Sequence, residues 1–190
     1  MRETVFFLEE SSARALLVGL LPRLGFDLAQ VRFVVFEGKS DLEKQIERKL
    51  RAWLNPHSQF VILRDQDSGD CSKIKNGLVE KCRRAGHPTT LVRIACRELE
   101  SWYLGDLKAV ETGFCLRNLA RHQATAKYRR PDLLGNPSLE LRQLTANRYQ
   151  KIGGSRILGH HLSLTENSSR SYMVFLSGIQ SLLAPRDPAS

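Results

Sequence analysis

The chain has 190 residues, of which 42% are hydrophobic and 26% charged, as is typical of a globular protein with one well-buried core. No apolar run approaches the roughly 20 residues of a membrane span, and Glu9-Glu10 interrupt the short apolar run near the N-terminus. We therefore expect no membrane contact and no signal peptide. The four cysteines are widely spaced and form no CxxC pair, which indicates reduced thiols in a cytoplasmic protein rather than a zinc site or a disulfide framework.

The first half of the chain alternates between short apolar runs and amphipathic stretches. Strands are expected at residues 4–9, 31–36, 60–63 and 89–95, and helices at residues 11–24, 40–54, 71–84 and 97–104. Strands that alternate with helices in this way are typical of βαβ units. The sequence therefore predicts an α/β fold with a mostly parallel sheet and helices on both faces.

The second half of the chain loses this alternation and becomes basic. Residues 1–113 carry 18 Lys and Arg against 16 Asp and Glu, whereas residues 114–190 carry 11 against 4. We expect an α/β domain over residues 1–110 and a helical, basic extension over residues 111–190 that packs on the same domain. Such an excess of positive charge is typical either of a nucleic-acid partner or of surface charge that keeps a protein soluble.

Acidic residues follow the first, third and fourth predicted strands. They are Glu9, Glu10, Asp65, Asp67, Glu98 and Glu100. If the strands are parallel, all of these side chains emerge at the same edge of the sheet, where ligands bind in open α/β folds. Carboxylates suit Mg²⁺ or Mn²⁺, and such ions activate water for phosphodiester hydrolysis. The alternative is a set of solvated acidic turns.

Some of the acidic positions allow two interpretations. Glu98 and Glu100 are two residues apart and would diverge on a helix, so we favour Glu100 as the one that faces the site. Asp70 is either a further ligand or the N-cap of the helix that follows it. Asp106 is either a site acid or a turn residue.

Several basic side chains are candidates for contact with a nucleic-acid phosphate. They are Arg97, Arg148, Lys151 and Arg156. Arg64, Arg93 and Arg97 can offset the acidic carboxylates or hold a phosphate, and a structural salt bridge is the alternative for each. The stretch KIGGSR, which includes Lys151, lacks the spacing of a Walker motif, so no nucleotide site is expected.

A glutamate that closes a first hydrophobic strand, with a DxD after a third, resembles the TOPRIM fold. That fold is shared by topoisomerases, primases and the nuclease half of the overcoming-lysogenization-defect (OLD) proteins. The chain also resembles a bacterial family of TOPRIM-like proteins that are often encoded beside an ABC-type ATPase. The matching stretches are LEESSARALLVGLLPRL, FEGKSDLEKQI, FVILRDQDSGDC and LVRIACRELESWYLGD, with weaker matches in NRYQKIGG and SRSYMVFLSGI.

The resemblance implies a nuclease that uses Mg²⁺ or Mn²⁺, with Glu9, Asp65 and Asp67 as ligands and Glu9 also moving a proton. Glu100 would assist. Glu10 stands where the family has a glycine after the glutamate, so either Glu9 or Glu10 can be the ligand. Glu37-Gly38 has the family's glutamate–glycine sequence, but it follows the second strand, whereas the family has this pair after the first. The resemblance also implies a partner ATPase and a role in anti-phage defence. The alternative is a regulatory or nucleic-acid-binding module that does not cleave.

Overall fold

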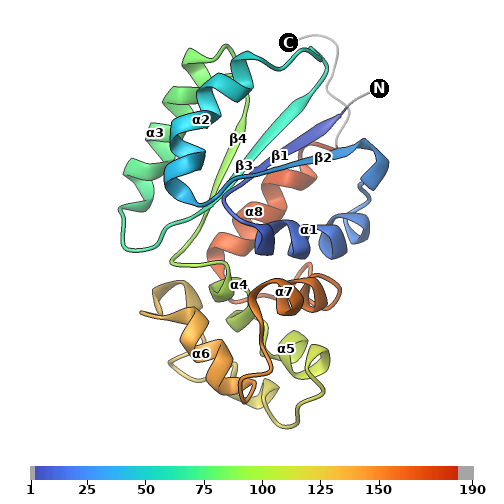
Figure 1. The fold of residues 1–190 in the computed structure, drawn as a ribbon. Helices are drawn as coiled ribbons and strands as arrows, with labels where there is room; N and C mark the ends of the chain where they lie inside the picture. Colours follow the sequence, from blue (N-terminus) through green and yellow to red (C-terminus); the bar gives the residue numbers. More distant parts are fainter. Residues whose placement is uncertain (1–2, 184–190) are drawn as a thin grey trace.

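Four parallel strands form one sheet in the order β2-β1-β3-β4 in the computed structural model, which describes residues 3–183 (Figure 1). The strands are β1 (Thr4–Leu8), β2 (Val31–Val35), β3 (Gln59–Asp65) and β4 (Leu91–Ala95). All neighbouring strands pair in parallel, with β1 in register with both β2 and β3. The α/β fold and the parallel sheet that the sequence predicts are therefore confirmed.

Helices cover both faces of the sheet because the chain changes direction across it. Helix α1 (Ser11–Arg23) leads from β1 outward to β2, whereas α2 (Lys39–Arg51) and α3 (Cys71–Arg84) lead the other way, to β3 and then β4. Since such crossovers are right-handed, connections that run in opposite directions lie on opposite faces. The face covered by α2 and α3 is therefore the one opposite α1 (Figure 1).

Alternate side chains of β1 enter two separate cores. Phe6 and Leu8 belong to the core on the α1 side, and Val5 and Phe7 to the core under α2 and α3. All four side chains are completely buried. A central parallel strand is buried on both faces, which explains its continuous apolar sequence.

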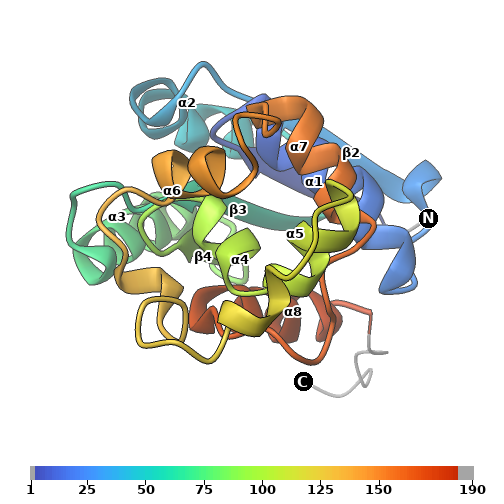
Figure 2. The ribbon, with the colours of Figure 1, turned by 90° about the horizontal axis from the view of Figure 1, so that it is seen from below.

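The second half of the chain is helical. Its helices are α4 (Glu100–Leu104), α5 (Leu107–Gly113), α6 (Pro137–Leu144), α7 (Lys151–Gly159) and α8 (Arg170–Gln180). Short 3₁₀ turns are η1 (Leu28–Gln30), η2 (Ala120–His122) and η3 (Pro131–Leu133). Helix α8 packs on β4, whereas α4, α5, α6 and α7 lie beyond one edge of the sheet (Figures 1 and 2). Helix α7 also packs along α1.

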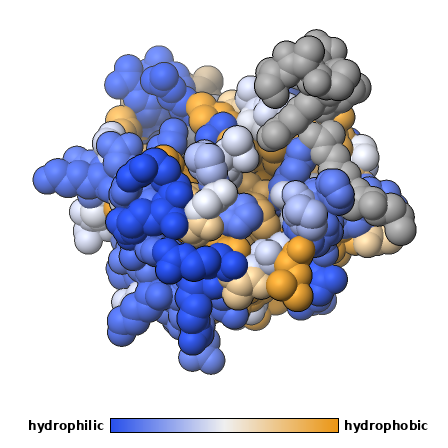
Figure 3. All heavy atoms as spheres, turned by 90° about the horizontal axis from the view of Figure 1, so that it is seen from above, coloured by the Kyte–Doolittle hydropathy of each residue, from blue (hydrophilic) through white to orange (hydrophobic). Residues whose placement is uncertain are grey.

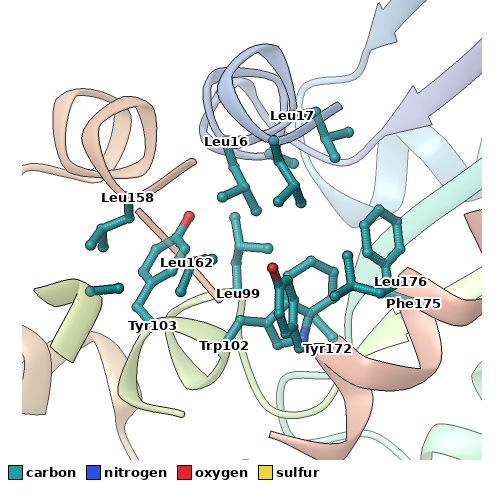
Figure 4. Close-up of a cluster of buried hydrophobic side chains, with 14 of the residues drawn as sticks. Leu16, Leu17, Leu99, Trp102, Tyr103, Leu158, Leu162, Tyr172, Phe175 and Leu176 are labelled. Carbon is teal, nitrogen blue, oxygen red and sulfur yellow. The ribbon is translucent and has the colours of Figure 1, made fainter. Parts of the chain in front are cut away.

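Helix α4 is the centre of the larger core (Figure 4). Its Trp102 and Tyr103 are fully buried. The Trp102 indole donates a hydrogen bond to Ser171 Oγ of α8 at 2.8 Å, and the Tyr103 hydroxyl donates one to Ser155 Oγ of α7 at 2.8 Å. Buried side chains that are both packed and hydrogen-bonded fix the position of this short helix.

Several sequence-based expectations are wrong in detail. The helix expected at residues 97–104 begins only at Glu100, because Arg97 has a φ of 65° and cannot continue a right-handed helix. The helix expected at residues 40–54 ends at Arg51, so Leu54 lies beyond it and is 94% exposed. The apolar side chains of Val79 in α3 and Val174 in α8 are 40% and 45% exposed.

Figure 3 shows the end of the molecule that lies opposite α4 to α7. Its surface is strongly hydrophilic on the side of α2 and α3. An ion pair joins the C-terminal parts of these two helices, with Arg84 lying 2.8 Å from Glu47. No helix within residues 3–183 combines the length and the apolar character needed to cross a bilayer.

The contact between α1 and α7 predicts opposite effects for two glycines of the same helix. A Cβ at Gly159 would press into the carbonyl oxygen of Leu16, whereas a Cβ at Gly153 meets nothing within 4 Å. Gly159→Ala should therefore lower the free energy of unfolding by about 1–3 kcal/mol. Gly153→Ala should raise it by about 0.5–1 kcal/mol because alanine favours a helix. Urea unfolding of both variants tests this, and equal effects would contradict the packing.

Candidate metal centre at the carboxyl edge of the sheet

The carboxyl ends of β1 and β3 are adjacent, and the chain departs from them in opposite directions. Open α/β sheets bind ligands at such a point. Glu9 and Glu10 follow β1 directly, and Asp65 is the last residue of β3. The Glu9 amide donates to the carbonyl of Leu63 at 3.3 Å, and Glu9 Oε2 accepts from the amide of Asp65 at 3.1 Å. The two strand ends therefore hold these carboxylates next to each other.

Asp65 lies in the middle of the acidic side chains. Burial raises the pKa of Asp65 well above its usual value, and the carboxylates of Glu100, Glu9 and Glu10 raise it further. Lys151 acts in the opposite direction. A carboxyl group in this position resists ionisation unless a cation compensates for its neighbours.

Glu100, the first residue of α4, points into the protein and is only 1% exposed. Its Oε1 accepts a hydrogen bond from the Tyr149 hydroxyl at 2.8 Å, but its buried Oε2 has no hydrogen-bond partner. Burial raises the pKa of Glu100 above its usual value. The Tyr149 ring lies where a Cβ at position 154 would be, so Gly154 is needed for this arrangement.

Lys151 is the cation that reaches the acidic side chains from the second half of the chain. Its Nζ lies 2.7 Å from the carboxylate of Glu10. Burial lowers the pKa of Lys151, but its interactions with Glu10, Glu100 and Asp65 outweigh burial and raise it. One ammonium group faces three carboxylates here, so the negative charge of the site is only partly balanced.

Asp67 does not lie beside Asp65 as an alternating strand would place it. The residue has a φ of 55°, so the chain turns, and its amide donates to the carbonyl of Arg97 at 2.7 Å. Its carboxylate forms an ion pair with Lys39, the first residue of α2, at 2.8 Å. Asp67 still contributes to the raised pKa of Glu9, for which burial is the largest cause. It therefore lies on the α2 side of Glu9.

The positive charge of Arg64 in β3 partly balances the negative charge of Glu9. Its guanidinium is buried and lies 3.8 Å from Glu9 Oε2 and 3.2 Å from Glu43 Oε1. Nε and Nη1 have no hydrogen-bond partner. Arg64 thus both offsets a carboxylate of the site, Glu9, and forms a salt bridge to Glu43 of α2.

The remaining acidic candidates have structural partners away from Asp65. Glu98 accepts a hydrogen bond from the amide of Ser138 at 2.9 Å. Asp70 caps α3 and Asp106 caps α5, each by accepting a hydrogen bond from a backbone amide of the first turn. Glu37 is exposed after β2. The preference for Glu100 over Glu98 agrees with this geometry.

The basic candidates are spread over several elements. Arg148 donates to the carbonyl of Phe114 at 3.2 Å, and Arg156 is exposed on α7. Arg97 lies in the turn after β4, and Arg93 donates to the carbonyl of Val174 in α8 at 3.2 Å. Thus Lys151 joins the acidic side chains, whereas Arg93 has a structural role.

Sequence analysis missed two residues of this site. Tyr149 holds Glu100 although 49 residues separate them, and Lys39 pairs with Asp67 across 28 residues. The available signal for Tyr149 was its place in NRYQKIGG, two residues before Lys151. Spacing alone could not connect either pair.

The residues present fit a divalent cation that keeps part of its water shell. Within residues 3–183, no three Asp, Glu, His or Cys side chains converge closely enough to enclose a metal ion by themselves. Mg²⁺ is usually bound by one or two carboxylates and several waters, so a closed cage is not required. Such a cation would give the buried Glu100 Oε2 the partner that it lacks and would stabilise the ionised form of Asp65, whose pKa is raised.

A family model described as a domain of unknown function, DUF4276, matches residues 8–180. The chain belongs to this family. A similar solved structure is the C-terminal region of the Burkholderia pseudomallei OLD protein, with 18% sequence identity and a TM-score of 0.56. The match covers 95% of this chain and 98% of that chain. No curated protein matches the sequence. The expected likeness to an OLD protein is thus confirmed at the level of the fold.

The electrostatics of Asp65 predict a gain in stability when its charge is removed. The pKa of Asp65 is higher in the folded than in the unfolded protein. Asp65 therefore lowers the free energy of unfolding increasingly as the pH rises from about 3.8 to its folded-state pKa. Without added metal, Asp65→Asn should raise the free energy of unfolding at pH 8 by on the order of 1–2 kcal/mol. The gain should shrink as the pH falls and vanish below about pH 3, where the carboxyl group is protonated in both states.

Urea unfolding in the presence of a chelator measures this effect. Asp70→Asn is the matched control, because it removes a nearby exposed charge and asparagine also caps a helix. A loss of stability in Asp65→Asn at pH 8 would contradict the stated cause of the pKa shift.

Proposed function

We propose that this protein is a divalent-metal-dependent nuclease that hydrolyses phosphodiester bonds of DNA or RNA. The observation that supports this proposal best is the grouping of Asp65 with Glu9, Glu10 and Glu100 where β1 and β3 end, with too little positive charge to balance them. The fold shared with the C-terminal region of an OLD protein agrees with it.

In this proposal, Asp65 and Glu100 would hold Mg²⁺ or Mn²⁺ together with bound water, and Glu9 and Glu10 lie beside them after the end of β1. When bound, the cation supplies a Lewis acid that polarises a phosphodiester and makes an attacking water more acidic. Glu9 accepts or returns a proton, since its raised pKa favours exchange closer to neutral pH. Asp67 supports Glu9 from the other side and holds Lys39 near the site.

The cations around the site suit a phosphate backbone. Lys151, now paired with Glu10, can turn to a phosphate oxygen when a metal ion takes over that carboxylate. Farther away, the segment between α5 and α6 carries exposed arginines that make no hydrogen bond or ion pair within residues 3–183. They are Arg117, Arg121, Arg129 and Arg130, and it is their side chains that lack such partners, since the backbones of Arg129 and Arg130 are hydrogen-bonded. Such free cations allow nucleic acid to bind with release of counterions.

A second candidate function is a TOPRIM-like module that binds nucleic acid or regulates a partner without cleaving. The ion pairs of Lys151 with Glu10 and of Lys39 with Asp67 favour it, because each occupies a carboxylate that a metal ion would need. In either case we propose a cytoplasmic protein that acts with an ABC-type ATPase, in anti-phage defence. Cleavage that appears only with the ATPase would distinguish a dependent nuclease from a self-sufficient one.

Nicking of supercoiled plasmid DNA and cleavage of a structured RNA, with Mn²⁺ or Mg²⁺, test the proposal. Asp65→Asn should reduce cleavage by at least about 100-fold, as expected when a charged catalytic group is lost. Asp67→Asn should reduce it by a smaller factor, because Asp67 acts through Glu9 and Lys39. Asp70→Asn should retain the activity, because Asp70 only caps α3. Full activity in Asp65→Asn, or equal losses in all three variants, would contradict the assignment.

A further inference from the structure

Two of the four cysteines, far apart in the sequence, meet beside the proposed metal centre. Cys71 is the first residue of α3, and Cys96 follows the last residue of β4. Their side chains line the same pocket, and the Cys71 thiol is near enough to help raise the pKa of Cys96. The spacing of the cysteines along the chain gives no sign of this proximity, which arises because the β3-α3-β4 crossover returns the chain to the start of α3. Cys82 is buried and Cys115 is exposed.

The thiol pair bridges the two segments that carry or support Asp67. Residues 66–70 connect β3 to Cys71, and Asp67 lies in this turn. On the other side, Arg97, which follows Cys96, accepts the hydrogen bond from the Asp67 amide at 2.7 Å. A covalent bond between the two sulfurs would therefore close a ring around the Asp67 turn.

We propose that Cys71 and Cys96 are a redox-sensitive pair that forms a reversible disulfide when the protein meets a peroxide. The pair is a modification site outside the carboxylate cluster, and its formation does not depend on nuclease activity. A further consequence, that the disulfide changes the Asp67 turn and thereby metal binding, is the one part that rests on the proposed function.

The chemistry takes two steps. Cys71 Sγ attacks one oxygen of hydrogen peroxide, the O–O bond breaks, and Cys71 becomes a sulfenic acid as one water leaves. Cys96 Sγ then attacks the Cys71 sulfur, and the departing hydroxyl group takes the Cys96 proton as a second water. Two thiols and one peroxide thus give one disulfide and two waters. Cys96 has its pKa raised to about 12 by burial, so it remains a thiol at neutral pH and Cys71 is assigned the first step.

Trypsin releases the two cysteines on separate short peptides, DQDSGDCSK and IACR, because Arg64 and Arg93 precede them. After treatment with a stoichiometric amount of peroxide, the unfolded protein should show two alkylatable thiols instead of four. Mass spectrometry should find the two peptides joined, and a dithiol should separate them and restore the count.

Matched variants decide whether this pair is responsible. Cys71→Ser and Cys96→Ser should each abolish the joined peptides, whereas Cys115→Ser should leave them unchanged and lower both counts by one. Four remaining thiols in the treated wild type, or a disulfide that involves Cys115 instead, would overturn the proposal. The nicking assay is run separately on the reduced protein, so failure of either proposal is seen independently of the other.

Discussion

Carboxylates that are buried close together in a protein must be balanced by positive charge, and this constraint organises the present structure. Glu9, Asp65 and Glu100 all have raised pKa values, with burial as the largest cause in each case. The available counter-charges are Arg64 beneath Glu9 and Lys151 beside Glu10. Such an arrangement does not add to stability, since neutral side chains of similar size would cost less. The proposed role in binding a cation or moving a proton would account for it.

The second half of the chain completes the site and is not an independent appendage to it. Helix α4 supplies Glu100, and the turn before α7 supplies Tyr149, which holds one of its oxygens. Helix α7 begins with Lys151, and the close crossing of α7 over α1 at Gly159 fixes where that lysine lies. The packing around α4 is therefore part of the candidate site, because it determines where the buried carboxylate of Glu100 points.

The sequence predicts the first half of the chain well, because the signals for its strands and helices are local. Apolar runs mark the strands, and the acids after them reveal the edge at which Glu9 and Asp65 meet. The position of Asp67 was harder to predict, because a positive φ turns its carboxylate towards Lys39. In other regions, tertiary contacts override local preference. Helix α7 contains Gly153-Gly154, and glycine disfavours a helix, so the local sequence does not predict it; packing on α1 stabilises it. The contact between Cys71 and Cys96 exists only once the crossover has formed.

Calorimetric titration of Mn²⁺ into the purified protein at pH 8 tests the central claim most directly. The account predicts that wild type and Asp70→Asn bind Mn²⁺ alike, whereas Asp65→Asn and Glu100→Gln bind at least about 10-fold more weakly, a loss of about 1.4 kcal/mol. Binding should also weaken at pH 6, because protons compete for carboxylates whose pKa values are raised. Equal binding by wild type and Asp65→Asn, or no binding by the wild type, would contradict a metal centre at this edge of the sheet.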